Sequence, residues 1–174
     1  MIIVTTSRHP SRQIRTSINF WAGALPQTQR ITRGSMNLKA LFEIAIQLNA
    51  QRLILLSRIK GNPGLFSFYF LNREKMVIGK RFRVVKSEMN HLTHKIPQNI
   101  NEKLTIIFRG DLLQETQDFF REFFFPILTP NSSNSDRLII NSAKKGIMIF
   151  VEKWNSKIIY SPIFYLKEIR SGTI

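Results

Sequence analysis

The chain of 174 residues contains no cysteine. Disulfide bonds, thiolate nucleophiles and zinc sites with cysteine ligands are therefore excluded. Histidine is also scarce, with three residues in the whole sequence. Two of them, His91 and His94, are three positions apart, but no Asp or Glu lies suitably beside them to complete a metal site. The sequence predicts neither a metal nor any other cofactor.

Long apolar runs are absent as well. No segment approaches the ~20 apolar residues of a membrane-spanning helix, and the start, MIIVTTSRHP, lacks the basic-then-apolar order of a secretory signal. Hydrophobic residues nevertheless make up 43% of the chain, enough to offset the entropy cost of folding a domain of this size. We expect a soluble, cytoplasmic, monomeric protein that makes no contact with a membrane.

Acidic residues are few, since 11 Asp and Glu stand against 26 Lys and Arg. The resulting formal net charge of +15 at pH 7 exceeds the magnitude of roughly 2 to 8 that keeps a small domain in solution. A field of this size attracts polyanions, of which nucleic acid is the commonest and an anionic membrane surface the next.

The positive charge is concentrated in the first hundred residues. The first acidic residue is Glu43, and six basic residues precede it, whereas ten basic residues face eight acidic ones beyond residue 100. Arginine dominates this opening stretch, and its planar guanidinium suits phosphate oxygens and bases. A generally basic, solvated surface is the alternative, but its charges would be scattered. The candidate RNA-binding residues are Arg8, Arg12, Arg15, Arg30, Arg33, Lys39, Lys60, Arg81 and Arg83.

Hydrophobic periodicity predicts an α/β fold. One helix can open at Pro10, with Ser7 to Ser11 offering capping hydroxyls, and ends at Pro26. Within it, Ile14, Ile18, Trp21 and Leu25 recur at helical spacing. Other expected helices cover residues 37–49 and 111–125, and strands cover 2–6, 28–32, 53–56, 65–71, 76–85, 104–108, 138–140, 147–152 and 157–166. This order implies a sheet with helices packed on it.

A repeated pattern within the sequence suggests that the single domain, 1–174, consists of two similar halves. Residues 2–26 and 105–126 both run strand, Arg-containing turn, aromatic helix and proline. Chance recurrence of a common pattern is the alternative. Residues 87–101 are polar and are the candidate joint, which places the N-terminal half at about 1–86 and the C-terminal half at about 87–174.

No constellation of catalytic residues is apparent. The segment Lys60-Gly61-Asn62-Pro63-Gly64 is followed by a strand, whereas a phosphate-binding P-loop requires a helix there. It is either a hairpin turn alone or a turn that also meets RNA backbone. No serine lies in a nucleophile elbow, and no carboxylate pair is placed for acid–base chemistry. We therefore expect no enzymatic activity.

The fourteen phenylalanines are expected mostly in the core. Phe119, Phe120 and Phe123 fall at helical spacing and are interpreted as packing residues rather than base-stacking ones. Phe20 and Phe42 each lie off the main apolar stripe of their helices, and their role stays open.

Several of these motifs, in this order, resemble the Brix domain. They are Thr5-Thr6-Ser7-Arg8, Pro10-Ser11, Arg15, Pro26, Arg30-x-x-Arg33-Gly34 and Lys60-Gly61-Asn62-Pro63-Gly64. The resemblance covers most of the first 75 residues, and the second half only in its strand–helix–strand plan, without an obvious second helix. The chain begins at its first strand and ends just after its last, and so resembles the minimal archaeal form.

The resemblance implies two halves, each a mixed sheet packed with helices and similar to the anticodon-binding domain of class II aminoacyl-tRNA synthetases. It also implies a non-catalytic role in ribosome biogenesis, with ribosomal RNA or its precursor, and assembly proteins, as partners. Arg33-Gly34 resembles the family segment proposed to contact RNA. An RNA-modifying enzyme and a stand-alone tRNA-binding module are the alternatives; the first would need a cofactor loop or catalytic acids that the sequence lacks.

Overall fold

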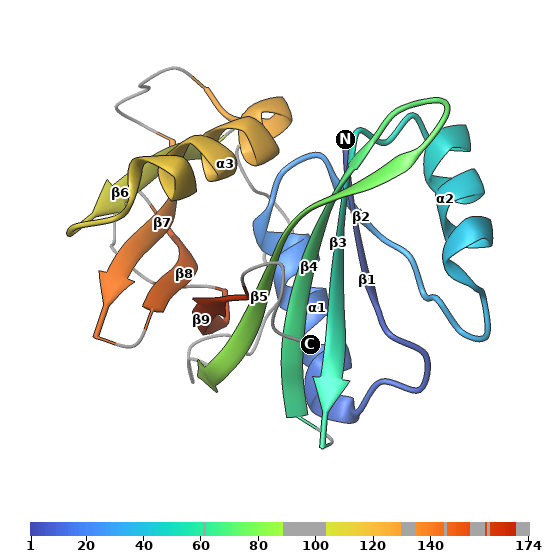
Figure 1. Cartoon of the computed structure of the whole chain (residues 1–174), viewed down its shortest axis with the longest axis horizontal. Helices are drawn as coiled ribbons and strands as arrows, with labels where there is room; N and C mark the ends of the chain where they lie inside the picture. Colours follow the sequence, from blue (N-terminus) through green and yellow to red (C-terminus); the bar gives the residue numbers. More distant parts are fainter. Residues whose placement is uncertain are drawn as a thin grey trace.

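One curled, mixed sheet of nine strands runs through the molecule (Figure 1). The computed structural model describes residues 1–60, 62–88, 104–129, 135–144, 146–153, 159 and 161–169. The strands are β1 (Ile2–Thr6), β2 (Thr28–Arg30), β3 (Arg52–Ile59), β4 (Asn62–Leu71), β5 (Met76–Glu88), β6 (Leu104–Arg109), β7 (Asp136–Ala143), β8 (Gly146–Glu152) and β9 (Ile163–Glu168). The helices are α1 (Arg12–Ala24), α2 (Leu38–Gln47), α3 (Gln114–Phe124) and the 3-10 turn η1 (Phe125–Ile127).

Strand pairing repeats along the chain. The sheet order is β2-β1-β3-β4-β5-β9-β8-β7-β6, and the antiparallel pair β5–β9 forms its middle. From the outside inwards, β1-β3-β4-β5 and β6-β7-β8-β9 each begin with a parallel pair and continue with two antiparallel pairs. Among the described residues, the second set has no counterpart of α2. The boundary at residues 86 and 87, and the likeness to anticodon-binding domains, stay predictions.

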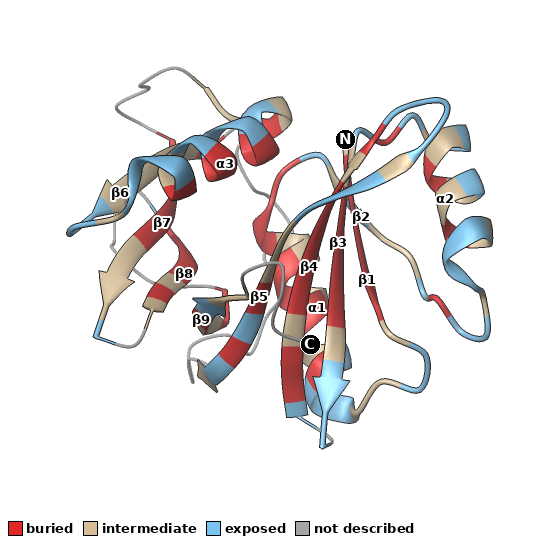
Figure 2. Cartoon of the chain, in the orientation of Figure 1, coloured by how far each residue is buried: buried red, intermediate tan, exposed pale blue. Residues whose placement is uncertain are grey.

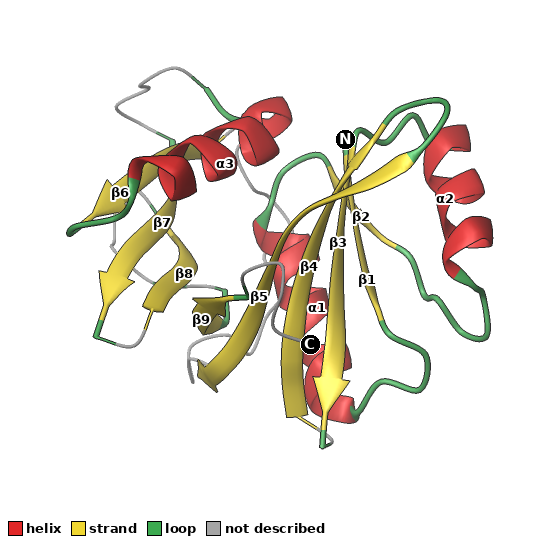
Figure 3. Ribbon diagram, in the orientation of Figure 1, coloured by secondary structure: helices red, strands yellow, loops and turns green. Residues whose placement is uncertain are grey.

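The helices cover the two faces of the sheet unequally (Figure 3). Helices α1 and α3 contribute to the larger core, together with the inward side chains of strands from both ends of the sheet. Helix α2 packs on the opposite face, where Leu41 and Ala45 contact Ile3 and Leu53 in a smaller core. Buried positions consequently run the length of β1, through half of β3 and through most of β4 (Figure 2).

Aromatic rings join the early and late parts of the chain in the larger core. The Phe68 ring on β4 lies 4.9 to 6.5 Å from the rings of six other phenylalanines, four of them on α3. On the other side, Trp21 of α1 packs on Phe164 of β9, with ring centroids 5.7 Å apart. Its Nε1 donates a hydrogen bond to the carbonyl of Pro162 at 3.3 Å. Helices α1 and α3 therefore each contact a strand from the other end of the sequence.

Lys80 adds a polar link between the same parts. Its ammonium group on β5 lies 2.7 Å from a carboxylate oxygen of Glu115 on α3 and 2.7 Å from one of Glu168 on β9. The Lys80 side chain is 13% exposed. Burial lowers the pKa of Lys80, but the hydrogen bonds that its ammonium group donates to the two carboxylates, with their negative charge, outweigh burial and hold the pKa above its ordinary value.

Most expected elements are present, and the local signals explain their ends. Helix α1 begins as expected, because the Ser11 side chain accepts a hydrogen bond from the Ile14 amide. Phe20 is buried and Phe42 packs against the smaller core, so both are packing residues. The phenylalanines of α3 are buried as predicted.

Several expected boundaries were wrong, and three of them have a local explanation. Helix α3 begins at Gln114 rather than at residue 111, because Gly110 has a positive φ of 70° and starts a turn before the helix. Helix α3 ends at Phe124 rather than at residue 125, and Pro126 lies within the 3-10 turn η1 that follows it. Strand β9 begins at Ile163 because Pro162 before it has no amide hydrogen to donate to a neighbouring strand.

Other predictions lie wholly or partly outside the described residues. The candidate joint is described only as far as Glu88, which ends β5. The sequence also predicts a loop over residues 129–135 and a turn between strands at residues 155 and 156, and both fall wholly or largely outside the described residues. Within the part of the chain that is described, no helix has the length and apolar character needed to cross a membrane.

Replacing Phe68 should test the shared core. Because Phe68 is fully buried among six rings, we expect Phe68→Ala to lower the free energy of unfolding by about 3 to 5 kcal/mol. The matched control is Phe125→Ala, since this ring is 76% exposed and its loss should cost less than about 0.5 kcal/mol. Urea denaturation measures both values, and equal losses would contradict the packing described for Phe68.

The Lys80 link predicts a dependence of stability on pH. A group whose pKa is raised by folding stabilises the folded state below its unfolded pKa of 10.5, and this contribution is lost as the pH rises through the folded pKa. Lys80→Met should therefore be less stable than the wild type at neutral pH, and the difference should shrink above pH 10.5. Lys86→Met is the control, because its ion pair with Glu88 is exposed to solvent. Thermal unfolding of the wild type and of Lys80→Met, from neutral pH to above pH 10.5, tests this. A difference in stability between the two proteins that does not change with pH would contradict the Lys80 link.

Candidate nucleic-acid interface

The carboxyl-terminal ends of four strands meet at one edge of the sheet. Strands β2 and β3 are parallel to β1, and β5 has the direction of β3 because both are antiparallel to β4. The arrowheads of β3 and β5 mark this edge in Figure 1. We call it the basic edge, and it comprises Arg8, Arg12, Arg15, Arg30, Arg33, Lys39, Arg58, Lys60, Arg83 and Lys86.

The first part of the basic edge is the loop between β1 and α1. Ser7 continues the sheet by donating its amide to the Leu56 carbonyl at 3.0 Å, and Arg8 then points into solvent as an exposed residue. Arg12 and Arg15 are exposed in the first two turns of α1, where Arg15 donates from its guanidinium to the Pro10 carbonyl at 3.0 Å. The first turn of α1 has no acidic residue, so its free amides and dipole favour an anion.

The second part is the loop between β2 and α2. Thr5 fixes this loop by donating its hydroxyl to the Ile31 carbonyl at 2.8 Å. Arg30 is half-buried at the end of β2, and Lys39 is exposed in the first turn of α2, which Asn37 caps by accepting from the Ala40 amide at 2.8 Å. These cations therefore lie beside the face that α2 covers, whereas Arg12 and Arg15 lie on the α1 side of the same edge.

Arg33 has a different environment from its neighbours. It is only 8% exposed, and its Nε donates to the Met36 carbonyl at 3.0 Å. Burial lowers the pKa of the Arg33 guanidinium, and the positive charge of nearby Arg8 lowers it further. Arg33 stays charged, since an arginine is not deprotonated in a protein. It shapes the loop from within and adds positive potential beside Arg8.

The third part is the hairpin between β3 and β4. Arg58, Ile59 and Lys60 are exposed at its end, and Lys60 has a positive φ of 49°. Gly64 allows the strands to approach closely, because a Cβ atom there would lie 2.4 Å from Cγ1 of Ile59. The segment is thus a hairpin turn, and its contact with RNA backbone stays a prediction.

Strand β5 completes the basic edge. Arg81 and Arg83 alternate with Phe82 and Val84, whose side chains belong to the larger core. The two arginines share the other face, and Arg81, which lies farther from the end of β5, is outside the basic edge. Opposite Arg83 in the ladder between β5 and β9 stands Lys167, an exposed cation of the second half.

Three cations at or beside this edge, Arg58, Lys86 and Lys167, were not among the predicted RNA-binding residues. Arg58 could have been included, because it precedes the turn motif by two residues in the chain. Lys86 also lies on β5, but it forms an ion pair with Glu88. The position of Lys167 depends on the pairing of β5 with β9, for which the sequence gives no local signal.

Acidic side chains are nearly absent from the basic edge. Residues 1–88 contain fifteen basic and three acidic residues. Glu74 lies in the turn between β4 and β5 at the opposite edge, Glu43 follows the first turn of α2, and Glu88 pairs with Lys86. In the described ranges, no group of three or more His, Asp or Glu is placed to hold a metal ion. The arrangement is suited to binding a polyanion.

Comparison with known proteins identifies the relatives of this chain. No family model matches it. A probable Brix domain-containing ribosomal biogenesis protein from Sulfurisphaera tokodaii is 35% identical over 75 residues, which is 43% of either chain. The protein of the same description from Saccharolobus solfataricus is 28% identical over 145 residues, covering 81% of this chain and 79% of the relative. The homologues of this chain are archaeal Brix-domain proteins.

Two solved structures of archaeal proteins superpose on nearly the whole of this chain. The probable ribosomal biogenesis protein from Aeropyrum pernix superposes with a TM-score of 0.81 over 97% of this chain and 96% of that one, at 22% identity. The archaeal Imp4-like protein Mil gives a TM-score of 0.68 over 95% and 96%, at 14% identity. At these identities the match shows the fold. The resemblance to the Brix-domain family is confirmed.

The contrast between Arg33 and Arg8 gives a stability prediction. Arg33→Ala removes a buried, charge-assisted hydrogen bond and should cost about 1.5 to 3 kcal/mol. Arg8→Ala removes an exposed charge that repels Arg33, so stability should change by no more than about 0.5 kcal/mol. Urea denaturation of the two variants checks this, and an equal loss in both would mean that Arg33 does not hold the loop.

Proposed function

We propose that this chain is a non-catalytic ribosome-biogenesis factor that binds ribosomal RNA, or its precursor, through the basic edge. The observation that carries the proposal is the gathering of Arg8, Arg12, Arg15 and Lys60 at one edge that is nearly free of acidic side chains. The names of the homologues, ribosomal biogenesis proteins, support the biological context.

The chemistry of the basic edge favours backbone over sequence recognition. Its cations lie on loops, helix starts and a hairpin end, where long side chains meet phosphates at several angles. Structured RNA presents its phosphates and 2′-hydroxyls to such a surface, and proteins read it mostly by shape. Salt should therefore weaken binding strongly, because each neutralised phosphate releases counterions.

Assembly proteins are the second class of partner that we propose. The second half has nearly balanced charge, with ten basic and eight acidic residues beyond residue 100. Among the described residues, its most exposed apolar side chain, Phe125, suits a protein surface better than a polyanion.

Replacing two arginines of α1 tests the RNA contact. Arg12→Ala with Arg15→Ala should weaken binding to a structured ribosomal RNA fragment without unfolding the protein, because both side chains are exposed. The slope of log affinity against log salt should fall by about 0.7 to 0.9 for each lost phosphate contact. Filter-binding titrations at several salt concentrations measure both quantities.

The matched control removes the same charge elsewhere. Lys144→Ala with Lys153→Ala takes two exposed cations from the second half. At 0.15 M salt, screening acts within about 8 Å, so the control should retain near wild-type affinity. If the control loses as much as the α1 variant, the net charge of the protein explains binding and the basic edge is not the contact surface.

A further inference from the structure

A cleft of about 710 Å³ opens where the second half meets the basic edge. One wall is the loop before α3, with Asp111 and Leu113, and the other is the end of β7 at Ser142. Arg83 of β5 and Lys167 of β9 lie at its rim. The volume falls within the ~300 to 1,000 Å³ of small-molecule binding sites.

Two cations, Arg83 and Lys167, and two acids, Asp111 and Glu168, line the cleft, and Glu168 is already paired with Lys80. The two cations at the rim therefore remain available to an anion. Arg83 and Lys167 stand directly opposite each other on antiparallel strands, and like charges in this position repel. Both are exposed, and within the described ranges neither forms an ion pair. A phosphate between them would relieve the repulsion and accept hydrogen bonds from both.

The walls of the cleft combine an apolar surface with a hydrogen-bond acceptor. Leu113 is 69% exposed, which leaves its side chain available for contact with a flat ring. Asp111 is exposed on the same loop, and its carboxylate only accepts hydrogen bonds. It therefore suits a ring that carries amino groups.

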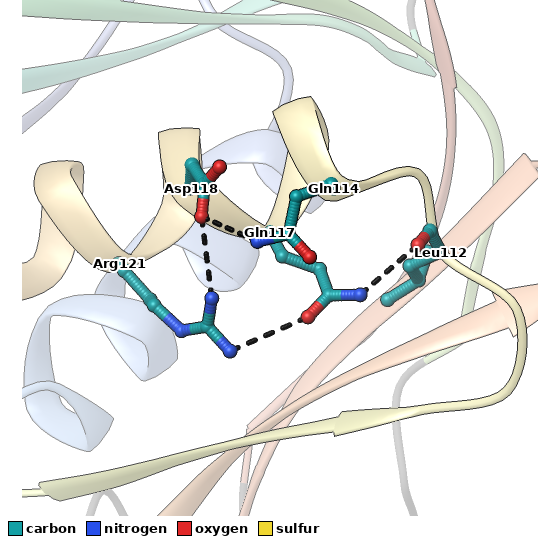
Figure 4. A network of polar contacts seen from close by, with 5 residues as sticks. All are labelled: Leu112, Gln114, Gln117, Asp118 and Arg121. Carbon is teal, nitrogen blue, oxygen red and sulfur yellow. Dashed lines mark hydrogen bonds and ion pairs between the residues drawn. The ribbon is translucent and has the colours of Figure 1, made fainter.

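A network of polar contacts holds the loop before α3 in place (Figure 4). Gln117 donates from Nε2 to the Leu112 carbonyl at 3.0 Å, and Arg121 donates to Oε1 of Gln117 at 3.4 Å. Arg121 is in turn held by Asp118 at 3.2 Å. On the other side, a Cβ atom at Gly110 would lie 3.0 Å from Cβ of Ser142, so the loop is close to β7. The cleft is therefore formed before any ligand arrives.

We propose that this cleft binds one unpaired nucleotide of the RNA that lies on the basic edge. The inference rests on the proposed function, because Arg83 belongs to both surfaces. Arg83 and Lys167 hold the phosphate, Leu113 packs on the base, and Asp111 accepts from its amino group. Guanine, cytosine and adenine carry such a donor, whereas the exocyclic groups of uracil are acceptors that the carboxylate repels.

Three small RNAs test the cleft. Two are hairpins with one unpaired nucleotide in the stem, guanosine or uridine, and the third has the same stem fully paired. We expect the wild type to bind the guanosine hairpin at least about fivefold more tightly than the paired one, with the uridine hairpin in between. Fluorescence anisotropy at 0.15 M salt gives the three affinities.

Two variants assign the preference to the cleft. Asp111→Asn should reduce the preference for guanosine over uridine, and Leu113→Ala should reduce the preference for either bulge over the paired stem. Both should bind the paired stem as the wild type does, and Lys153→Ala, which lies outside the cleft, should change none of the ratios. Both positions are exposed, so the variants should fold, which circular dichroism verifies.

The outcomes separate this inference from the proposed function. Equal wild-type affinity for the bulged and paired RNAs overturns the cleft but leaves RNA binding at the basic edge intact. Unchanged ratios in both cleft variants also overturn it. The Arg12 and Arg15 double variant should lower affinity for all three RNAs by one common factor. Absence of binding to every RNA overturns the proposed function and the cleft together.

Discussion

The packing of α1 and α3 on the same face of one sheet is the constraint on which the rest of the structure depends. Phe68 lies at the centre of the contact with α3, and Trp21 carries the contact of α1 with β9. Because α1 and α3 pack on strands to both sides of the middle pair, β5 and β9, they hold β9 beside β5. This pairing sets Lys167 opposite Arg83 and so creates the rim of the cleft.

The distribution of charge follows from this architecture. The larger core occupies one face and the α2 core part of the other, which leaves the ends of the strands as the places where many cations can gather. Two of the acids of α3 pair within the protein: Glu115 contacts Lys80 of β5, and Asp118 contacts Arg121 of the same helix. Positive charge near Arg8 therefore remains uncompensated, at the cost of mutual repulsion with Arg33.

How much of this could be predicted from the sequence depended on how local the signal was. The strand of residues 2–6 and the start of α1 were predicted correctly, because β-branched residues and the Ser11 cap act within a few positions. The first-half location of most candidate cations followed from counting charges. The burial of Arg33 did not, because it depends on how the loop folds over the sheet. The proximity of Lys167 to Arg83 also could not be predicted, since it arises from strands that meet only in the folded protein.

The placement of the α3 phenylalanines has a consequence for how the chain is made. Phe68, Phe70 and Phe82 are all in place by residue 82, but the rings that cover them, Phe119 and Phe123, are synthesised much later. While translation proceeds between these points, the nascent chain carries an aromatic surface with no helix to cover it. This aromatic surface is therefore covered only in a late step, when α3 leaves the exit tunnel and docks. A slow stretch of translation before residue 124 would prolong the exposure of that surface and favour aggregation.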